Sequence, residues 1–376
     1  MSWKKIKLSD CCISIADGDH QPPPRSKDGI PFVTIANIVN NQFDFTDTMF
    51  VPKDYYEKLV DKRKPQKDDI LYSVVGSFGI PVLIKDNKHF VFQRHIAILR
   101  PNISIDARFL YYTMLSRDFY MKADAAAIGA AQRTVTLTAL RNIEITVPPI
   151  EIQHRIADIL SAYDDLIENN RKQIKLLEEE AQRLYKEWFV DLRFPGHEHT
   201  KIADGVPEGW HKALLGEIID VKYGKDHKGI PDGAIPVYGS GGLMRKCDRA
   251  LYDGESVLIP RKGSLNNIIY VDEKFWTVDT MFYTELKMPN IGLLVYFFLK
   301  SLDMYSMNIG AAVPSMTTAI LNAMEIVLPD NTLLERFQCL TKKNYDAIKT
   351  LNIQSELASQ ARDRLLPKLM SGEVEA

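Results

Sequence analysis

The fold of this chain is decided by a stretch of sequence that occurs twice. Residues 129–155 read GAAQRTVTLTALRNIEITVPPIEIQHR, and residues 310–336 read GAAVPSMTTAILNAMEIVLPDNTLLER. The two stretches align without a gap at a fixed offset of 181 residues, the difference between 310 and 129. Beyond the opening Gly-Ala-Ala, identical positions include Thr136 and Thr317, Leu140 and Leu321, Glu144 and Glu325, Ile145 and Ile326, Pro148 and Pro329, and Arg155 and Arg336. An internal repeat of this length predicts two similar modules in one chain.

The repeat extends to other parts of the chain. Residues 210–217 (WHKALLGE) echo residues 3–10 (WKKIKLSD), and Gly263-Ser264 stands where Gly76-Ser77 does. Two similar modules suit a ligand that is itself nearly two-fold symmetric. Double-stranded DNA is the commonest ligand of that kind, so the repeat favours a DNA-binding protein.

A long amphipathic helix is expected directly after the first copy. From Ile152 the apolar residues recur in alternating steps of four and three, which is the pattern of a coiled coil. Asn170 interrupts this apolar seam, and it either fixes the register of the helix or is a polar residue tolerated near solvent. The predicted seam consists of Ile156, Leu160, Tyr163, Ile167, Asn170, Ile174, Leu177, Ala181, Leu184 and Trp188.

A second long helix follows the second copy, and its seam is poorer. One long helix cannot bury an apolar seam by itself, so we expect the two helices to pack against each other. Antiparallel packing is favoured, because parallel packing would crowd both modules to one side. The second seam is predicted to contain Phe337, Leu340, Ile348, Leu351, Ala358 and Leu365, with Asn344, Ser355 and Arg362 intruding.

The remainder of the first module reads as short strands and a few helical turns. Residues 30–35, 69–75 and 95–99 are β-branched or aromatic runs bounded by Gly, Pro or Asp, and 143–147 is a last strand. Helices are expected over 107–122 and 138–141. The predicted fold class is α+β, with two β-rich modules joined by two long antiparallel coiled-coil helices and a pseudo-two-fold internal repeat. The predicted parts are a first module (1–150), a first helix (151–192), a linker (193–209), a second module (210–330) and a second helix with its tail (331–376).

Composition limits the function only loosely. The 376 residues suffice for two or more domains, and 45% apolar with 26% charged residues indicates a folded protein. The net charge of −2 means that any surface for nucleic acid must be local. The start of the chain lacks the apolar core of a signal peptide, and no run approaches the roughly 20 apolar residues that cross a bilayer. The four cysteines show no metal-ligand or disulfide spacing, which favours a cytoplasmic location.

The sequence carries no catalytic motif that we recognise. It lacks the phosphate loop of nucleotide-binding enzymes and the Asp/Asn-Pro-Pro-aromatic tetrapeptide of adenine methyltransferases. The glycines at 239–242 lie in a strand-rich region and are interpreted as a flexible turn. His197-Glu198-His199 has no third ligand nearby, so no metal site is predicted there. The protein is therefore expected to recognise its ligand without transforming it.

These residues together resemble the specificity subunit of type I restriction–modification systems, over essentially the full length of the chain. Residues 129–157 are similar to that family's junction between recognition domain and helix, and residues 365–374 (LLPKLMSGEV) are similar to its usual ending. There are two departures. The family usually places Glu-Gln after the Pro-Pro, whereas Ile152 precedes Gln153 here, and Leu333-Leu334 replaces both residues in the second copy.

The resemblance implies a division of labour between subunits. The chain would carry two target recognition domains, each reading one half of a bipartite DNA sequence, with the helices acting as a ruler. It would have no catalytic activity and bind no cofactor itself. Two modification (methyltransferase) subunits would dock on the helices and methylate adenine with S-adenosylmethionine. Two restriction subunits, which are ATP-dependent translocases and nucleases that use Mg²⁺, are possible further partners.

Candidate DNA contacts are basic and polar residues on the predicted loops, because Lys and Arg bind phosphates and Arg, Asn, Gln, Ser and Thr read base edges. In the first module they are His20, Gln21, Arg25, Lys27, Ser77, Phe78, Gln93, Arg94, His95, Gln132, Arg133 and Thr134. In the second module they are Lys225, His227, Lys228, Tyr238, Ser240, Arg261, Lys262, Ser264, Asn266 and Ser315. Each is otherwise a solvated surface residue or a polar strand-edge residue, and Gln132 and Arg133 alternatively organise the start of a helix.

The loops differ between the two copies, while the flanking strands and helices agree. This difference predicts unlike half-sites and therefore an asymmetric DNA target. The main alternative is a coiled-coil scaffold whose two β-rich modules bind protein, which the near-neutral charge allows.

Overall fold

The computed structural model describes residues 3–18, 23–130, 132–307 and 313–376. The chain divides into two compact units: unit 1 comprises residues 1–170 and 353–376, and unit 2 comprises residues 171–352. The long helices α5 (Ile150–Tyr185) and α9 (Asn331–Ser371) each contribute one part to either unit. Within the described ranges, every helix is too short or too polar to cross a membrane.

Unit 1 contains a four-stranded sheet in the order β2-β10-β7-β8 and a three-stranded sheet in the order β6-β3-β9. A separate antiparallel pair joins β1 to β11, and β9 runs parallel to β3. The strands are β1 (Lys4–Lys7), β2 (Cys12–Asp17), β3 (Ile30–Val33), β4 (Ile38–Val39), β5 (Gln42–Phe43), β6 (Met49–Val51), β7 (Ile70–Ser73), β8 (Pro81–Leu83), β9 (Val91–Phe92), β10 (Ile96–Pro101) and β11 (Glu144–Val147). The helices are η1 (Leu8–Cys11), η2 (Ile35–Asn37), α1 (Lys53–Lys58), η3 (Asp61–Arg63), α2 (Ala107–Leu115), α3 (Arg117–Ala126) and α4 (Leu137–Asn142).

Unit 2 contains a six-stranded sheet in the order β15-β20-β18-β19-β16-β17, and an antiparallel pair of β14 with β21. The strands are β12 (Ile202–Ala203), β13 (Val206–Pro207), β14 (His211–Leu214), β15 (Ile219–Tyr223), β16 (Asp232–Gly239), β17 (Gly242–Cys247), β18 (Tyr252–Pro260), β19 (Ile269–Thr277), β20 (Met281–Leu286) and β21 (Glu325–Leu328). The helical segments are the π-helical turn η4 (Lys186–Val190), η5 (His197–His199), α6 (Leu215–Ile218), α7 (Gly292–Ser301) and α8 (Thr318–Asn322).

The internal repeat predicted from the sequence is confirmed by the topology. The pair β1–β11 in unit 1 has its counterpart in β14–β21, and the parallel pair β3–β9 has its counterpart in β16–β19. Thr136 and Thr317 both cap the short helix that follows them, accepting from Ala139 N at 3.1 Å and from Ile320 N at 3.3 Å. A side-chain acceptor at this position satisfies a backbone N–H that the helix itself leaves unpaired.

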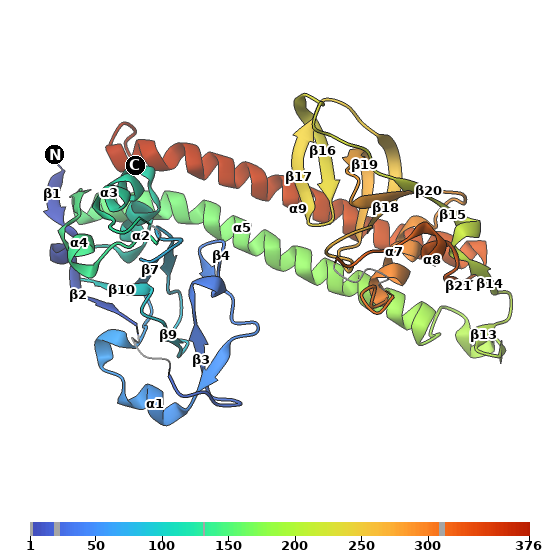
Figure 1. Ribbon diagram of the computed structural model, residues 1–376, viewed down its shortest axis with the longest axis horizontal. Coiled ribbons are helices and arrows are strands. Elements are labelled where there is room, and N and C mark those ends of the chain that lie inside the picture. Colours follow the sequence, from blue (N-terminus) through green and yellow to red (C-terminus); the bar gives the residue numbers. More distant parts are fainter. Residues whose placement is uncertain (1–2, 19–22, 131, 308–312) are drawn as a thin grey trace. The chain divides into compact units, whose positions relative to one another are not determined.

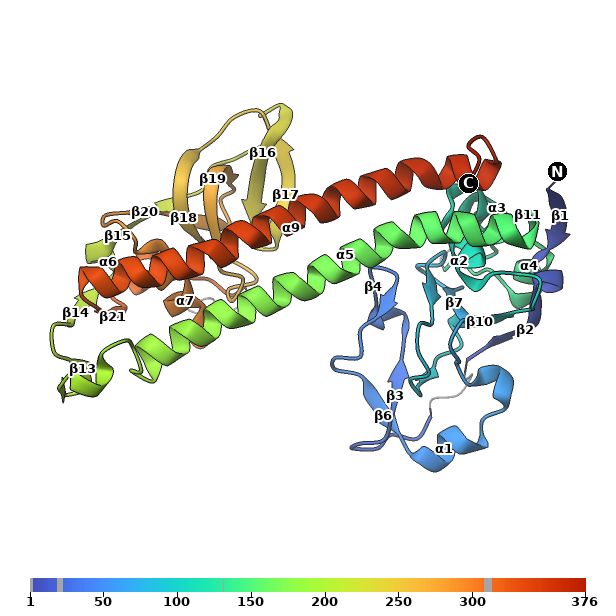
Figure 2. The same cartoon turned by 180° about the vertical axis from the view of Figure 1, so that it is seen from behind.

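In unit 1 the first part of α5 packs antiparallel against the last part of α9. Asp164 pairs with Arg362, and Asn170, six residues further along α5, bonds Ser355, which lies seven residues back along α9. The two segments run side by side in both views of the molecule (Figures 1 and 2). The antiparallel arrangement predicted from the sequence is confirmed in this unit.

In unit 2 the last part of α5 packs in the same antiparallel sense against the first part of α9. Asn344 donates to the carbonyl oxygen of Leu177 at 3.3 Å. Tyr185, the last residue of α5, and Trp188 in the following turn η4 both contact Phe337, which lies earlier in α9. As the residue numbers rise along α5 and η4, the numbers of their partners on α9 fall, so the two segments are antiparallel.

Two expectations about the seams are corrected. Leu340, predicted to lie in the seam of α9, is 40% exposed, whereas the next residue, Thr341, is 1% exposed. The buried face of α9 therefore includes Thr341 and leaves out Leu340. Asn170 is 2% exposed, so its interpretation as a polar residue near solvent is wrong. Its amide donates to the Ser355 hydroxyl at 3.2 Å, which leaves the register-fixing interpretation.

The helix expected over 107–122 is two helices. The chain turns at Ser116, whose backbone is extended with ψ of 149°. The Ser116 hydroxyl accepts from Phe119 N at 3.3 Å and thereby caps α3. Because the periodicity of apolar residues continues across Ser116, the pattern alone did not reveal this break.

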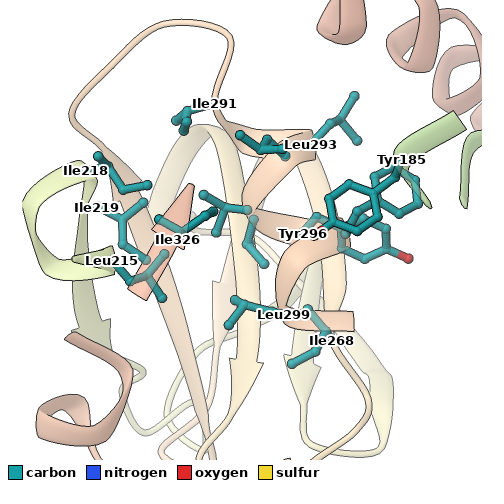
Figure 3. Packing of buried hydrophobic residues seen from close by; sticks show 14 of the residues in the cluster. Tyr185, Leu215, Ile218, Ile219, Ile268, Ile291, Leu293, Tyr296, Leu299 and Ile326 are labelled. Atoms are coloured by element: carbon teal, nitrogen blue, oxygen red, sulfur yellow. The ribbon is translucent and has the colours of Figure 1, made fainter. Parts of the chain in front are cut away.

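Each unit has its own apolar core beside its segment of the helix pair. In unit 2 the core joins α6, β15, α7 and β21 to Tyr185 of α5, and Figure 3 shows Leu215 and Ile219 beside Ile326. In unit 1 the core joins β7, α2 and α4 to Leu366 and Leu369 of α9. Burial of this apolar surface holds each β-rich module on its part of the helix pair.

Candidate nucleic-acid interface

Four loops of unit 1 meet at one place, and we call them the four-loop cluster. They are the loop that leaves β2 at Gly18, the loop 74–79 after β7, the turn 93–96 between β9 and β10, and the loop 127–135 between α3 and α4. Ser77, Phe78, Gln93, Arg94, His95, Gln132, Arg133 and Thr134, all predicted DNA contacts, lie on them.

Backbone hydrogen bonds tie these four loops together. Gly18 N donates to Ile96 O at 3.3 Å, and Val74 N donates to His95 O at 2.9 Å. Gly76 N donates to Arg133 O at 3.0 Å. Because the loops are bonded through their backbones, their side chains project from a fixed support.

Unit 2 has a four-loop cluster with the same backbone bonds. Gly224 N donates to Met281 O at 3.2 Å, and Arg261 N donates to Thr280 O at 2.8 Å. Gly263 N donates to Pro314 O at 3.0 Å. The backbone of the cluster is therefore duplicated along with the fold.

Glycine is required at the same two places in each cluster. A Cβ atom on Gly18 would lie 2.1 Å from Phe92 O, and one on Gly224 would lie 2.0 Å from Val278 O. Gly76 and Gly263 have φ of +70° and +86°, a backbone conformation that residues with side chains rarely adopt. These glycines allow the close approach of the loops.

Phe78 and Arg133 are packed against neighbouring helices in unit 1. Phe78 is 9% exposed and stacks on Tyr120 at 5.7 Å with an interplanar angle of 6°. Arg133 forms an ion pair with Asp124 at 3.0 Å, and its guanidinium lies 5.9 Å from the Phe78 ring. Arg133 thus contacts the end of α3.

Arg94, Ser77 and Gln132 are exposed on the surface of the cluster. His95 is half-buried, and its burial, followed by the charge of Arg94, lowers the pKa of its imidazole. The side-chain amide of Gln132 lies 3.7 Å from where a Cβ of Gly76 would stand, so two of the predicted loops are in contact. Gln93 and Thr134 are half-buried beside them.

The remaining candidates of unit 1 lie elsewhere. Arg25 and Lys27 are exposed and flank Ser26, which bonds Phe50 of β6 at the beginning of β3. The cluster lies at the other end of β3, where Gln93 N donates to Val33 O. His20 and Gln21 fall outside the described residues.

In unit 2 the loop after Gly224 carries three of the candidates. Lys225 and Lys228 are exposed, and Lys225 is held by the Trp276 indole, which donates to its carbonyl oxygen at 2.9 Å. His227 is half-buried and receives the Arg245 guanidinium on its ring nitrogen at 3.3 Å. This loop joins the cluster through the bond of Lys225 N to Thr277 O at 2.9 Å.

The other candidates of unit 2 surround the turn at Gly263. Lys262 and Ser264 are exposed, and Lys262 forms a β-bridge with Ser315. The turn of the β16–β17 hairpin reaches the same place, because Asn267 donates to Ser240 O at 2.9 Å. Arg261 is half-buried and donates to the carbonyl oxygen of Asp279 at 3.1 Å.

Two candidates of unit 2 have structural contacts of their own. Tyr238 is half-buried in a small apolar cluster, and burial, followed by the charge of Glu273, raises the pKa of its phenol to about 12. Asn266 is exposed, but its side-chain oxygen accepts from Met304 N at 2.9 Å. The sequence prediction left out Asp279, which is exposed in this cluster. Its counterpart Arg94 stands at an offset of 185 residues, so the repeat at 181 did not align them.

A buried glutamine ties each β-rich module to its long helix. Gln153 accepts from Asp106 N at 2.9 Å and donates to Pro148 O at 2.9 Å. In the second copy Leu334 stands at the position of Gln153, and Gln338, one helical turn later, performs this role. Gln338 accepts from Leu293 N at 3.3 Å and donates to Glu255 Oε1 at 2.6 Å.

Several ionisable side chains of unit 1 are buried or paired within the module. Burial, followed by the charge of Asp10, raises the pKa of the Cys11 thiol to about 12, so this thiol is protonated at neutral pH. In a polar cleft of unit 1, Arg100 pairs with Asp69 at 2.8 Å and Arg108 pairs with Asp158 at 2.7 Å. Within the described ranges no three His, Cys, Asp or Glu residues are placed to hold a metal ion.

Comparison with known proteins identifies the relatives of this chain. The family profile described as "Type I restriction modification DNA specificity domain" matches residues 2–179 and 207–364. The chain is 27% identical to the type I restriction enzyme MjaIX specificity subunit of Methanocaldococcus jannaschii, covering 99% of this chain and 93% of that protein. It is 24% identical to the type I restriction enzyme HindI specificity subunit of Haemophilus influenzae, with 99% of both proteins covered.

A solved structure shares the fold. The crystal structure of the type I restriction–modification S subunit from M. genitalium superposes with a TM-score of 0.65 at 20% identity. The match covers 98% of this chain and 96% of that one. The fold of this chain is therefore shared by a protein of very different sequence.

Proposed function

The chain belongs to the family of type I restriction–modification DNA specificity domains, and on that premise we propose that it reads an asymmetric, bipartite DNA sequence, one half-site with each unit. As a specificity subunit it recognises DNA and assembles with the other subunits of its system, of which it is a non-catalytic component.

One observation carries this proposal: the two four-loop clusters share a backbone and differ in their side chains. The same three hydrogen bonds join the loops at Gly76 and at Gly263, as described above. Unit 1 presents Arg94, Ser77 and Gln132, whereas unit 2 presents Lys262 and Asp279 among others. Two clusters with the same backbone and different side chains suit two half-sites of different sequence, because the side chains are the groups that read the bases.

We further assign the reaction to partner subunits. Two modification subunits would bind the helix pair and supply S-adenosylmethionine for adenine methylation, and restriction subunits using ATP and Mg²⁺ would join them where present. Large apolar side chains exposed on α5 and α9 support the docking of partners on these helices. They are Leu166, Leu176, Leu340, Ile353 and Leu357.

Mapping methylated adenines across the genome tests the proposal. Cells would carry this chain with its modification partner, and control cells would carry the partner alone. We expect one motif, made of two different half-sites separated by a gap of constant length. A continuous motif, a palindromic motif or methylation independent of this chain would contradict the proposal.

The scaffold alternative is tested by the salt dependence of DNA binding. A chain that neutralises phosphates releases counterions, so its affinity for a duplex falls steeply between 50 and 200 mM salt, on the order of a thousandfold for about six contacts. If the complex of this chain with its modification partner bound target DNA no better than the partner alone, the two modules would be protein-binding elements instead.

A further inference from the structure

The turn between β9 and β10 in unit 1 and the turn between β19 and β20 in unit 2 are the same structural element. In the first, Ile96 N donates to Gln93 O at 3.0 Å, and in the second Met281 N donates to Val278 O at 2.9 Å. Both are four-residue turns closed by a bond from the fourth residue to the first. Arg94 and Asp279 therefore occupy the same second position of equivalent turns.

The surroundings of the two turns confirm this equivalence. Gln93 N donates to Val33 O at the end of β3, and Val278 N donates to Tyr238 O near the end of β16. The third residue of each turn accepts from the loop that carries Gly76 or Gly263, as given above. Each turn is thus bonded to three neighbouring segments, and its backbone is fixed.

The side chains at this shared position are exposed and opposite in charge. Arg94 and Asp279 are both exposed, and among the described residues neither side chain takes part in an ion pair. Arg261 binds the backbone of the Asp279 turn, because its guanidinium donates to Asp279 O at 3.1 Å. The same guanidinium lies 5.4 Å from the centre of the Tyr223 ring. The Asp279 carboxylate itself is left available to a ligand.

A carboxylate at this place is informative because it cannot bind a phosphate. A guanidinium can contact either a phosphate or a base, whereas an acidic side chain on a DNA-binding face is repelled by the phosphates. Its favourable partner in the major groove is an amine that donates a hydrogen bond, and cytosine N4 is the usual one. Exposed lysines nearby, Lys225 and Lys262, can contact phosphates and offset the repulsion.

We propose that Arg94 and Asp279 are one specificity position used twice: Asp279 accepts a hydrogen bond from N4 of a cytosine in the second half-site, and Arg94 donates to O6 and N7 of a guanine in the first. This inference rests on the proposed function, in which each unit binds one half-site. It assigns one base in each half-site to a named side chain.

The experiment selects bound duplexes from a randomised DNA library with the full chain assembled with its modification partner. Wild type is compared with Asp279→Asn, Arg94→Gln and Asp248→Asn. Asp248 is an exposed acid of unit 2 that follows β17, so its substitution removes the same charge outside the four-loop cluster. Each selected motif gives the base preference at every position of both half-sites.

We expect Asp279→Asn to reduce the preference for cytosine at one position of the second half-site by about tenfold or more, and to leave the first half-site unchanged. Arg94→Gln should do the same for one guanine of the first half-site, and Asp248→Asn should change neither. If Asp279→Asn instead raised the affinity for all sequences equally, Asp279 would be only a charge that repels DNA, and the inference would fail. Loss of preference at a base other than cytosine would overturn the assignment as well. A wild-type chain that selected no motif would contradict the proposed function itself, which separates the two failures.

Discussion

Arg362 of α9 donates to the carboxylate of Asp164 of α5 at 2.5 Å, within the seam of the helix pair in unit 1. The second oxygen of the same carboxylate accepts from the hydroxyl of Tyr112 at 2.6 Å, and Tyr112 belongs to α2 of the recognition module. Burial, followed by the charge of Asp164, raises the pKa of the Tyr112 phenol, which keeps this donor protonated. One carboxylate thus joins both helices and the module.

Replacing Arg362 with alanine should destabilise the protein. Both side chains of the pair are only 20% exposed, so the substitution leaves a largely buried carboxylate without its cation. The expected loss is on the order of 1–3 kcal/mol of unfolding free energy, measured by urea denaturation. Arg364→Ala is the control, because Arg364 is exposed on the same helix and should change stability by less than about 0.5 kcal/mol. Equal losses for the two variants would show that the ion pair contributes nothing specific.

Asn170 and Ser355 should show a favourable coupling in a double-mutant cycle. Asn170→Ala and Ser355→Ala each remove the hydrogen bond between these two side chains, and the double variant removes both groups at once. We expect a coupling energy of about 0.5–1.5 kcal/mol, with the double variant less destabilised than the sum of the single ones. Thermal or urea unfolding of the four proteins measures it. Strict additivity would mean that the bond between the two side chains does not contribute to stability.

The repeat and the helix pair could be predicted because they depend on local periodicity. The spacing of Ile156, Leu160 and Ile167 fixed which face of α5 is buried, and all three are at most 7% exposed. Thr136 and Thr317 could be matched since a capping residue acts on the backbone three residues ahead. The glycine turns at Gly76 and Gly263 were recognisable for a similar reason, because their backbone conformation favours glycine.

The rest depends on contacts between residues far apart in the sequence. The equivalence of Arg94 and Asp279 is defined by bonds to Val33 and Tyr238, and no sequence pattern records such bonds. The three polar residues that intrude on the α9 seam could be recognised as intrusions, but their partners on α5 could not. Asp164, for example, reads as one more charged residue of an amphipathic helix. The role of Gln338 was hidden because it lies four residues beyond the position that aligns with Gln153.

Gln338→Ala should destabilise unit 2 by removing an acceptor and a donor together. Gln338 is 8% exposed, and its loss leaves Leu293 N without an acceptor at the start of α7 and removes a donor to Glu255. We expect a loss of about 1–3 kcal/mol, measured by urea denaturation. Gln173→Ala on the exposed surface of α5 is the matched control and should be nearly neutral. A neutral Gln338→Ala would show that water replaces both bonds.

The protein should lose stability on acidification partly through His95. Burial, followed by the charge of Arg94, lowers the pKa of this imidazole in the folded state, whereas the unfolded chain titrates near 6.5. Between these two values the unfolded state binds more protons, so stability falls as the pH drops below about 6.5 and is unaffected by His95 above it. Urea midpoints of wild type and His95→Gln at pH 7.5 and 5.5 measure the effect, and wild type should lose more. An equal loss would show that other groups dominate the pH dependence.

Arg94→Gln should raise the pKa of His95 part of the way toward its ordinary value in an NMR titration, because the charge of Arg94 is the smaller of the two causes that lower it.

Arg261 should affect the recognition of the second half-site alone. Its guanidinium holds the Asp279 turn through a backbone carbonyl and lies over the Tyr223 ring, so it both carries charge and supports the cluster. Arg261→Ala should cost about 1–3 kcal/mol of binding free energy for the cognate sequence and relax the base preference of the second half-site only. Arg261→Lys keeps the charge but loses the planar donor fork, so it should restore affinity for any sequence without restoring the base preference.

Arg249→Ala, at an exposed arginine of the same unit, is the control and should leave the base preference intact. Competition binding with cognate duplex and duplexes altered in either half-site distinguishes these outcomes. If Arg261→Ala weakened binding to all sequences equally and Arg261→Lys restored it fully, Arg261 would be a phosphate contact, and the support it gives to the Asp279 turn would not matter for reading the sequence.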